Sequence, residues 1–313
     1  MTIDESDLLD VLINPKKNRT GQYICDCPFC NKERHFYISV KTQLWDCKKC
    51  GESGNIYKLL SHLNKLYLVV GSTIQYKEKI QSIIDVSDDV SDIAVPDMKT
   101  VTMPAGWKVV QSDDYLIGRR ITNKQCEKYQ IGRTNLLRKY KDYILIPIYQ
   151  DGEIKGFFGR YAAAKVPKGV PKYNNSKGVN FAALLGGYDE IIRGEIYTVV
   201  LVEGVFDKIK VDTALRLHGK DFIKCCYTFG KKISDIQIQR LVEKGVCNVI
   251  LLYDFDAVRE MKSYSTELDK WFTVSVTYTN KKDIDECTDQ EAWEVLQKAV
   301  PSKEFRFSTI EMI

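Results

Sequence analysis

Long apolar stretches are missing from this 313-residue chain. No window approaches eighteen uncharged apolar residues, and the acidic first ten residues lack the basic region of a secretory leader. These absences argue against membrane-spanning and secreted proteins, so we expect a cytoplasmic one. The composition, 44% hydrophobic and 28% charged, is that of an ordinary globular protein, and the length predicts two or three compact units.

A disulfide framework is missing as well. The chain has ten cysteines, but six of them show no regular spacing: Cys25, Cys126, Cys225, Cys226, Cys247 and Cys287. Several of these lie in apolar, strand-like runs, where a reduced cysteine behaves as a small hydrophobic residue. The cysteine usage therefore favours a reducing compartment. Internal repeats and low-complexity tracts are absent too.

Charge is unevenly distributed although the net charge is only +4. Residues 105–180 carry 15 Lys and Arg against 6 Asp and Glu, whereas residues 181–313 carry 18 against 22. One interpretation is a solvated surface. The other is a surface that binds a polyanion, followed by a site that holds divalent cations.

The four remaining cysteines form two C-x₂-C pairs, Cys27 with Cys30 and Cys47 with Cys50. Four thiolates in this arrangement are typical of a structural zinc site. Cys25 and His35 could also act as ligands, although the four cysteines already fill a tetrahedral shell. Residues 34–40, which alternate aromatic and basic side chains, either stack on unpaired bases or stabilise the ribbon itself.

The remaining pattern predicts an α/β protein with three folded parts. We expect a zinc-ribbon domain over 1–70, closed by a helix over 56–63, and a linker over 71–112. A mixed α+β basic part follows over 113–190, with a hairpin that turns at Asp151-Gly152. Strands alternate with helices over 191–300, which predicts a mainly parallel sheet, and residues 301–313 form a tail. We expect strands over 199–202, 225–229, 249–253 and 273–278, and capping boxes at Ser234 and Thr288.

Carboxylates follow three of these strands. Glu203 follows the first, Asp254 and Asp256 follow the third, and Asp283 and Asp285 follow the fourth. Asp207 lies one helical turn beyond Glu203. Chemistry in an open parallel sheet gathers beyond the carboxyl ends of its strands. Because clustered carboxylates repel one another unless cations lie between them, the pattern predicts Mg²⁺ or Mn²⁺.

These residues resemble the motifs of a known family. Glu203-Gly204 and Asp254-Phe255-Asp256 are similar to the Glu-Gly and Asp-x-Asp motifs of the TOPRIM fold, and residues 282–286 resemble a later acidic motif of DnaG-type DNA primases. The zinc ribbon and several segments of the basic part resemble the same primases, in the same order: residues 115–121, 144–148, 156–160 and 172–176. Phe255 stands where the family usually has glycine, Cys30 stands where it commonly has histidine, and 141–143 match a basic motif only in part. The shortness of the chain suggests a compact, phage-encoded version.

The resemblance implies roles for individual residues. Glu203, Asp254 and Asp256 would hold catalytic magnesium or manganese, supported by Asp207, Asp283 and Asp285. Substrate or template would be bound by a second group of side chains, namely Arg119, Lys141, Arg160, Lys172, Asn174 and Ser176.

The function that follows is a DNA-dependent RNA primase acting on single-stranded DNA and ribonucleoside triphosphates, with a replicative helicase on a separate chain as a partner. If the protein is phage-encoded, it would work in the bacterial host cytoplasm. One alternative is a non-catalytic, RecR-like mediator with zinc and a TOPRIM fold, which lacks the basic segment around Arg160 and Lys172. A TOPRIM nuclease is a second alternative, against which the ribbon and the basic part both argue.

Overall fold

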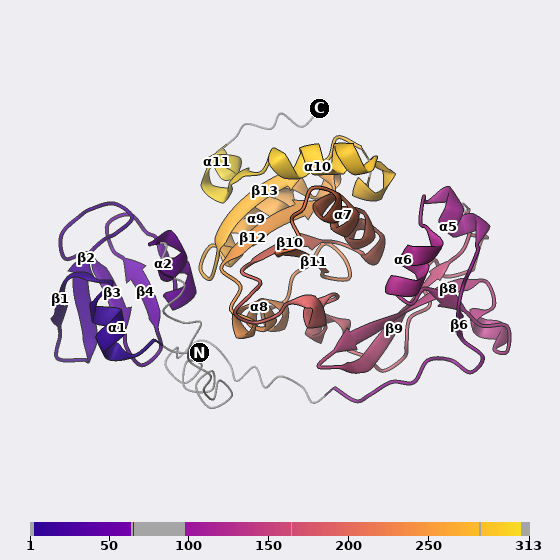
Figure 1. Ribbon diagram of the computed structural model, residues 1–313, viewed down its shortest axis with the longest axis horizontal. Helices are drawn as coiled ribbons and strands as arrows, with labels where there is room; N and C mark the ends of the chain where they lie inside the picture. The colour runs from indigo at the N-terminus through magenta and orange to yellow at the C-terminus, as the bar shows by residue number, and fades with distance from the viewer. Residues whose placement is uncertain (1–2, 64, 66–97, 164, 282, 308–313) are drawn as a thin grey trace.

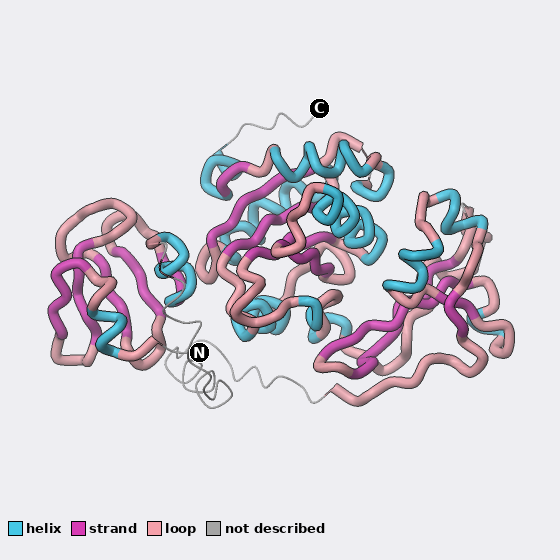
Figure 2. Tube along the Cα trace, in the orientation of Figure 1, coloured by secondary structure: helices cyan, strands magenta, loops and turns pink. Residues whose placement is uncertain are grey.

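Three β-sheets follow one another along the chain (Figure 1). The computed structural model describes residues 3–63, 65, 98–163, 165–281 and 283–307. The first sheet, with its cysteine cluster, forms an N-terminal ribbon. The second forms an antiparallel part, and the third forms a mainly parallel part with helices on both faces (Figure 2). The fold class predicted from the sequence is confirmed.

The ribbon is a meander of five short antiparallel strands in the order β1-β2-β3-β4-β5. Their bounds are β1 Ile13–Lys17, β2 Gln22–Asp26, β3 Phe36–Ser39, β4 Leu44–Cys47 and β5 Ser53–Asn55. Burial alternates along β2, where Tyr23 and Cys25 face the core, as expected of a strand with one packed face. Helix α1 (Glu5–Leu9) precedes the sheet, and α2 (Ile56–His62) closes it as predicted.

The second sheet is antiparallel, with the order β6-β7-β8-β9. It contains β6 Lys108–Val109, β7 Gly132–Arg133, β8 Tyr143–Gln150 and β9 Glu153–Tyr161, with helices α5 Asp114–Gly118 and α6 Asn123–Lys128 between its first two strands. The predicted hairpin is β8 and β9. Its two loop residues have positive φ, 57° at Asp151 and 77° at Gly152, as the favoured tight hairpin turns require.

The third sheet has the order β11-β10-β12-β13-β14, and every pair except β13 with β14 is parallel. Its strands are β10 Thr198–Val202, β11 Ile223–Tyr227, β12 Asn248–Tyr253, β13 Thr273–Tyr278 and β14 Val300–Pro301. The helices are α7 Val205–Leu217, α8 Asp235–Glu243, α9 Val258–Leu268, α10 Asp289–Gln297 and α11 Ser302–Phe307. Ser234 and Thr288 form the predicted capping boxes of α8 and α10.

Alternate residues of the central strands supply two different cores. Val199 and Leu201 of β10 pack in one cluster, and Val200 and Val202 pack in the other. The second cluster also contains Ile144 of β8, so the antiparallel part and the α7 face of the parallel sheet share one core. This shared packing places the basic segment next to the carboxyl ends of the parallel strands.

Two elements differ from the prediction. The strand expected over 225–229 ends at Tyr227, because Phe229 has a left-handed backbone with φ of 63°. The expected tail over 301–313 begins with the end of β14 and with α11. Most of the expected linker lies outside the described residues, although β6 forms within its last part and pairs with β7. Among the described helices, none has the length and apolar character needed to cross a membrane.

The ribbon packs against the parallel part. The ammonium of Lys58 in α2 donates to the carbonyl oxygen of Asp269 at 2.9 Å, and Glu52 forms an ion pair with Lys303 of α11. Cys247, just before β12, is fully buried in the ribbon's own core cluster. Polar and apolar contacts therefore both join these two parts of the chain.

Candidate functional site

Three carboxylates meet at the carboxyl ends of β10 and β12. One oxygen from each of Glu203, Asp254 and Asp256 lies within 4.8 Å of the other two. The parallel register brings them together, because Leu201 of β10 lies beside Leu251 of β12 and both strands end within the next two residues. The backbone N–H of Asp254 also donates to Glu203 at 3.4 Å. The structure thus brings together the three residues predicted to hold a catalytic metal.

The electrostatics of this cluster indicate an excess of negative charge. Burial, together with the charges of Glu203 and Asp283, raises the pKa of Asp254 to about 8. Burial also raises the pKa of Glu203, against the opposing effect of the Asp254 N–H. Carboxylates that resist ionisation in this way are stabilised by a bound cation, and oxygen donors suit a hard divalent ion such as Mg²⁺.

The supporting acids lie on the same side of the sheet. Asp207 in the first turn of α7 accepts a hydrogen bond from the Gly204 N–H at 3.0 Å, and burial and the nearby acids raise its pKa. Asp283 acts electrostatically on Asp254. Asp285 forms an ion pair with Arg119, but its burial raises its pKa by more than this partner lowers it. Lys282, within the same motif, lies outside the described residues.

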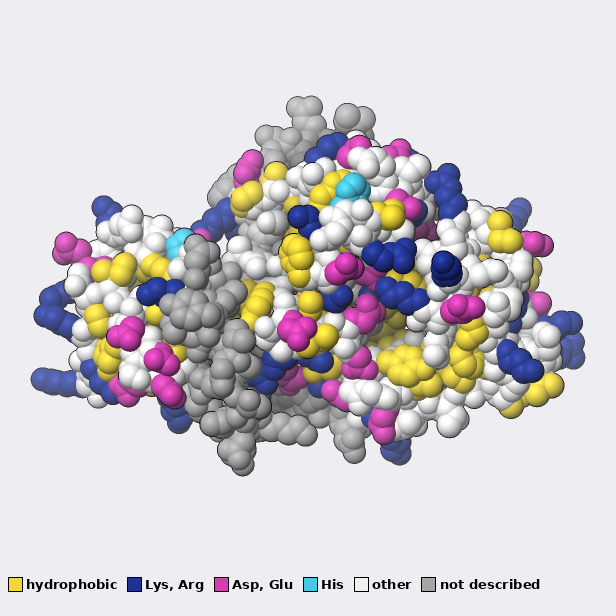
Figure 3. All heavy atoms as spheres, viewed as in Figure 1, with side chains coloured by type: hydrophobic (Ala, Val, Ile, Leu, Met, Phe, Trp, Pro, Cys, Tyr) yellow, Lys and Arg dark blue, Asp and Glu magenta, His cyan; other side chains and the backbone are white. Residues whose placement is uncertain are grey.

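A hollow of about 640 Å³ lies between the acidic loop and the basic part. Arg119 and Arg160, predicted to bind substrate or template, both line it and both donate to the hydroxyl oxygen of Tyr115, at 2.9 and 3.0 Å. Asp283 and Asp285 line it too, and Asp285 is the ion-pair partner of Arg119. Figure 3 shows several Lys and Arg side chains near the border between the parallel part and the antiparallel part. The hollow therefore holds cations beside Asp283, which acts electrostatically on Asp254 of the carboxylate cluster.

The other predicted binding residues differ in their surroundings. Lys172 and Lys141 are exposed, and the Lys172 ammonium lies 5.4 Å from the ring centre of Tyr173. Asn174 donates to the Lys139 carbonyl, and the buried Ser176 hydroxyl is bonded twice to the Phe157 backbone. Ser176 thus holds this segment against β9 and Asn174 ties it to Lys139, and the part of both residues in binding stays a prediction.

Close approach of the same segment explains the glycine before Arg160. A Cβ atom on Gly159 would lie 2.2 Å from the Asn174 carbonyl oxygen. Because no side chain fits there, glycine allows residues 172–174 to run along β9, where Tyr173 bridges to Arg160. The Arg160 guanidinium lies 5.0 Å from the ring centre of Tyr173, so backbone packing sets the place of a predicted binding residue.

The four paired cysteines form a second cluster, in the ribbon. Cys27 and Cys50 have sulfurs 3.9 Å apart, as do Cys30 and Cys47. A tetrahedral zinc ion with bonds of about 2.3 Å requires sulfurs about 3.8 Å apart, so the donor set and its spacing fit zinc. Although burial opposes ionisation, the N–H groups of Cys50 and Lys49 lower the pKa of Cys47 to about 7. Neither Cys25 nor His35 belongs to the four-sulfur group.

The aromatic residues of the ribbon serve mainly its own packing. Phe36 is fully buried, and its ring centre lies 5.0 Å from that of Trp45. Phe29 stacks on Trp45 at 4.8 Å and on His62 of α2 at 4.1 Å. Of the two interpretations of residues 34–40, self-stabilisation therefore holds for Phe36, while Tyr37 is partly exposed.

Sequence reasoning missed Lys231, which belongs to the carboxylate cluster. Its ammonium lies 2.5 Å from a carboxylate oxygen of Asp256. The available signal was its position. Lys231 comes four residues after the end of β11, and β11 runs parallel to β10, so it ends at the same edge of the sheet as Glu203. Lysine pairs are common on surfaces, so position alone did not distinguish this one.

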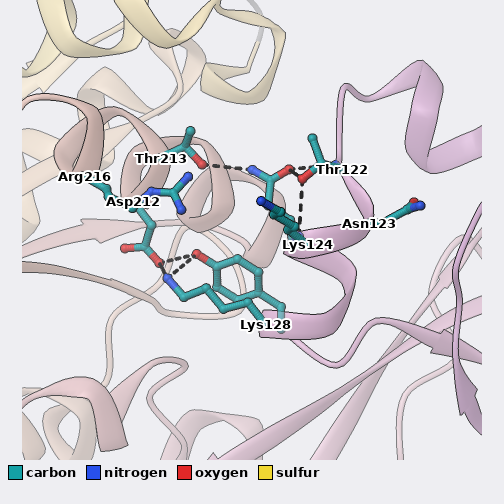
Figure 4. A pocket seen from close by; sticks show the side chains of 9 residues that line it. Thr122, Asn123, Lys124, Lys128, Asp212, Thr213 and Arg216 are labelled. Carbon is teal, nitrogen blue, oxygen red and sulfur yellow. Dashed lines mark hydrogen bonds and ion pairs between the residues drawn. The ribbon is translucent and has the colours of Figure 1, made fainter.

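A further hollow, of about 590 Å³, lies between α6 and α7 (Figure 4). Thr213 of α7 accepts a hydrogen bond from Gln125, and Asp212 accepts one from the Tyr129 hydroxyl at 2.7 Å. The buried Lys208 ammonium also lies 2.8 Å from both Asp212 and Glu190. These residues form a polar joint between the antiparallel and parallel parts.

The fold and these two clusters define an α/β protein with a cysteine ribbon and a carboxylate site at a parallel sheet edge. In sequence the chain is similar to DNA primases, as the motif order predicted. It is 25% identical to a DNA primase of Legionella pneumophila, and the alignment covers 98% of this chain and 62% of that protein. It is also 25% identical to a DNA primase of Aquifex aeolicus, with 81% of this chain and 57% of that protein aligned. The chain thus spans about 60% of the length of these curated relatives, and no family model matches it.

Solved structures of primases align with it as well. The zinc-binding and RNA polymerase domains of the Aquifex aeolicus primase align at 21% identity and a TM-score of 0.42, covering 95% of this chain and 83% of that one. The catalytic core of the E. coli primase aligns at 20% identity and a TM-score of 0.46, covering 62% and 74%.

Proposed function

We propose that this protein is a DNA-dependent RNA primase with a TOPRIM-type parallel part. In this reaction the 3′-hydroxyl oxygen of one ribonucleotide forms a bond to the α-phosphorus of the next nucleoside triphosphate. The bond from that phosphorus to the bridging oxygen breaks, pyrophosphate leaves, and the hydroxyl proton passes to solvent. Single-stranded DNA selects each nucleotide by base pairing.

The observation that carries the proposal is the carboxylate triad of Glu203, Asp254 and Asp256 beside a cation-lined hollow. The triad would hold Mg²⁺ or Mn²⁺, which neutralises the triphosphate and lowers the pKa of the attacking hydroxyl. Arg119 and Arg160 would bind phosphates, because phosphoryl transfer needs positive charge fixed around the reacting oxygens. Asp207, Asp283 and Asp285 would hold this arrangement in place.

Two other parts extend the proposal. The four-cysteine ribbon would contain structural zinc and contact the template, and a replicative helicase on a separate chain would be the partner. If the protein is phage-encoded, its place of action would be the cytoplasm of the bacterial host. Lys172 and Lys141, exposed on the basic part, would follow the backbone of the template.

A RecR-like mediator remains the alternative, since it also combines zinc with a TOPRIM fold. The paired arginines at Tyr115 favour the primase, because they fix positive charge in the hollow that Asp283 and Asp285 also line, as phosphoryl transfer requires and DNA binding alone does not.

One assay separates the candidates. Purified protein is incubated with Mg²⁺ or Mn²⁺, labelled ribonucleotides and single-stranded DNA of randomised sequence. A primase yields short labelled RNA that requires template and metal, a mediator yields no product, and a nuclease cuts the template. Sequencing of the products would then reveal the initiation site and the primer length.

A further inference from the structure

Lys231 is directed at the carboxylate cluster by an unusual turn. Phe229 and Gly230, which precede it, have φ of 63° and 137°. A left-handed backbone at a bulky residue such as phenylalanine is energetically unfavourable and persists only where surrounding contacts hold it. The turn therefore has a conformation that local preference alone would not give.

Contacts on both sides hold this turn in place. The Gly230 N–H donates to the backbone carbonyl of Glu203 at 2.9 Å, and the Thr228 hydroxyl lies 2.8 Å from the Gly230 carbonyl and 2.9 Å from the Tyr253 hydroxyl. The Phe229 ring packs against Phe181 and Tyr227. The turn is thus fixed to the two strands that carry the metal-binding acids.

The charge of Lys231 acts on the whole cluster. Its ammonium is paired with Asp256 at 2.5 Å, and Glu203 and Asp254 also act on it electrostatically. Asp256 is the most accessible of the three acids, with a side chain 75% exposed, and the Lys231 side chain is 38% exposed. Both partners reach solvent. The lysine can therefore leave Asp256 without leaving an unpaired charge buried in the protein.

We propose that Lys231 exchanges partners during the proposed reaction: a divalent cation displaces it from Asp256, and the freed ammonium then binds the phosphates of the incoming nucleoside triphosphate. The inference rests on the proposed function. Three carboxylates within 4.8 Å need positive charge, and a single lysine supplies only part of it. Once a divalent ion supplies the rest, a lysine on a flexible stem can follow a mobile phosphate as a point charge.

The neighbouring residue offers a matched control. Lys232 carries the same charge and is exposed, and it forms no ion pair with any residue in the described part of the chain. Lys231→Met removes the ammonium and keeps the length of the side chain, Lys231→Arg keeps the charge, and Lys232→Met removes a charge beside the site. Thermal unfolding of all three variants should match the wild type, because the side chains are not buried.

The first measurement is calorimetric titration of Mn²⁺ into nucleotide-free protein at pH 8. Lys231→Met should bind Mn²⁺ about 3- to 10-fold more tightly than the wild type, since the competing cation is gone, while Lys232→Met should not change. Equal or weaker Mn²⁺ binding in Lys231→Met would overturn the exchange.

The second measurement is the KM for ribonucleotides during primer synthesis. Lys231→Met should raise it about tenfold or more, with a smaller effect on kcat, and Lys231→Arg should restore most of the affinity. A KM in Lys231→Met equal to that of Lys232→Met would overturn phosphate binding. If the wild type makes no RNA, the primase proposal fails by itself, and Mn²⁺-dependent binding of a nucleoside triphosphate, measured by calorimetry, still tests Lys231.

Discussion

At the scale of single residues, Asp254 matters most because it directly follows the buried strand β12 and the charges of Glu203, Asp283 and Asp256 all act on it. We expect Asp254→Asn to lower primer synthesis by about 10²-fold or more, since it removes one charge from the group that would hold the metal. Initial rates at saturating template and nucleotide measure this. Asparagine has nearly the same shape, so the Tm of the metal-free protein should be equal or higher. Wild-type synthesis that still requires metal would contradict the assignment.

The raised pKa of Asp254 predicts how metal uptake depends on pH. In the metal-free protein this carboxyl holds its proton up to about pH 8. Metal must displace that proton, so Mn²⁺ affinity should rise between pH 6 and 8, and up to one proton should be released at pH 7. Heats of binding in buffers of different ionisation enthalpy count the protons. No release at pH 7 would contradict the prediction.

The raised pKa of Asp254 also determines how the stability of the metal-free protein changes with pH. The folded pKa lies above the ordinary value of 3.8, so the folded state binds more protons than the unfolded state between about pH 4 and pH 8. The contribution of Asp254 to the stability of the metal-free protein is therefore present at low pH and is lost as the pH rises through about 8.

Several residue-level features could be predicted from the sequence, and one could not. Glu203, Asp254 and Asp256 each follow an apolar run, and parallel strands bring such positions to one edge, so their meeting followed from the strand pattern. Lys231 was missed because its direction depends on the left-handed backbone of Phe229. Local propensity opposes that conformation, and contacts with Phe181 and Tyr227 stabilise it. The contact with Phe181, which is distant in the sequence, cannot be read from a local pattern.

At the scale of the elements, the ribbon should depend on its metal. We expect Cys47→Ser to lose one equivalent of zinc and to unfold locally over 20–65, because a structural zinc site contributes folding free energy directly. Zinc content and hydrogen exchange over these residues measure the loss. Cys25→Ala is the matched control, since Cys25 is equally buried but lies outside the four-sulfur group. Retained zinc in Cys47→Ser would contradict the four-cysteine site.

Element boundaries show what sequence patterns miss. The hairpin, the parallel strands and both capping boxes depend on neighbouring residues, and the sequence predicted them. Strand β14 and helix α11 were missed, because the pairing of Val300 with Val276 and the burial of Phe305 depend on β13 and α9. Such tertiary contacts leave little trace in a short local pattern.

At the scale of the whole molecule, the polar joint around Lys208 holds the basic part against the parallel part. Its side chain is 3% exposed, and although burial opposes its charge, Asp212 and Glu190 raise its pKa. We expect Lys208→Met to destabilise the protein by about 3–5 kcal/mol, since it leaves two acids without their shared cation. Urea unfolding measures this. Lys210→Met, which breaks a more exposed pair with Asp289, should cost about 1 kcal/mol or less. An equal loss of unfolding free energy in the two variants would contradict a stabilising role for the polar joint around Lys208.

The contacts between the ribbon and the parallel part have a consequence for synthesis of the chain. Lys58 binds the carbonyl of Asp269, and Glu52 pairs with Lys303, so the partners are separated by 211 and 251 residues. The four cysteines of the ribbon are available for zinc soon after it leaves the ribosome, but its docking cannot be complete until α11 has been made. At about 5–20 residues per second, this interval is on the order of 12 to 50 s. During that time the ribbon lacks its contact with Lys303, so the zinc site has to hold the ribbon's fold before its docking is complete.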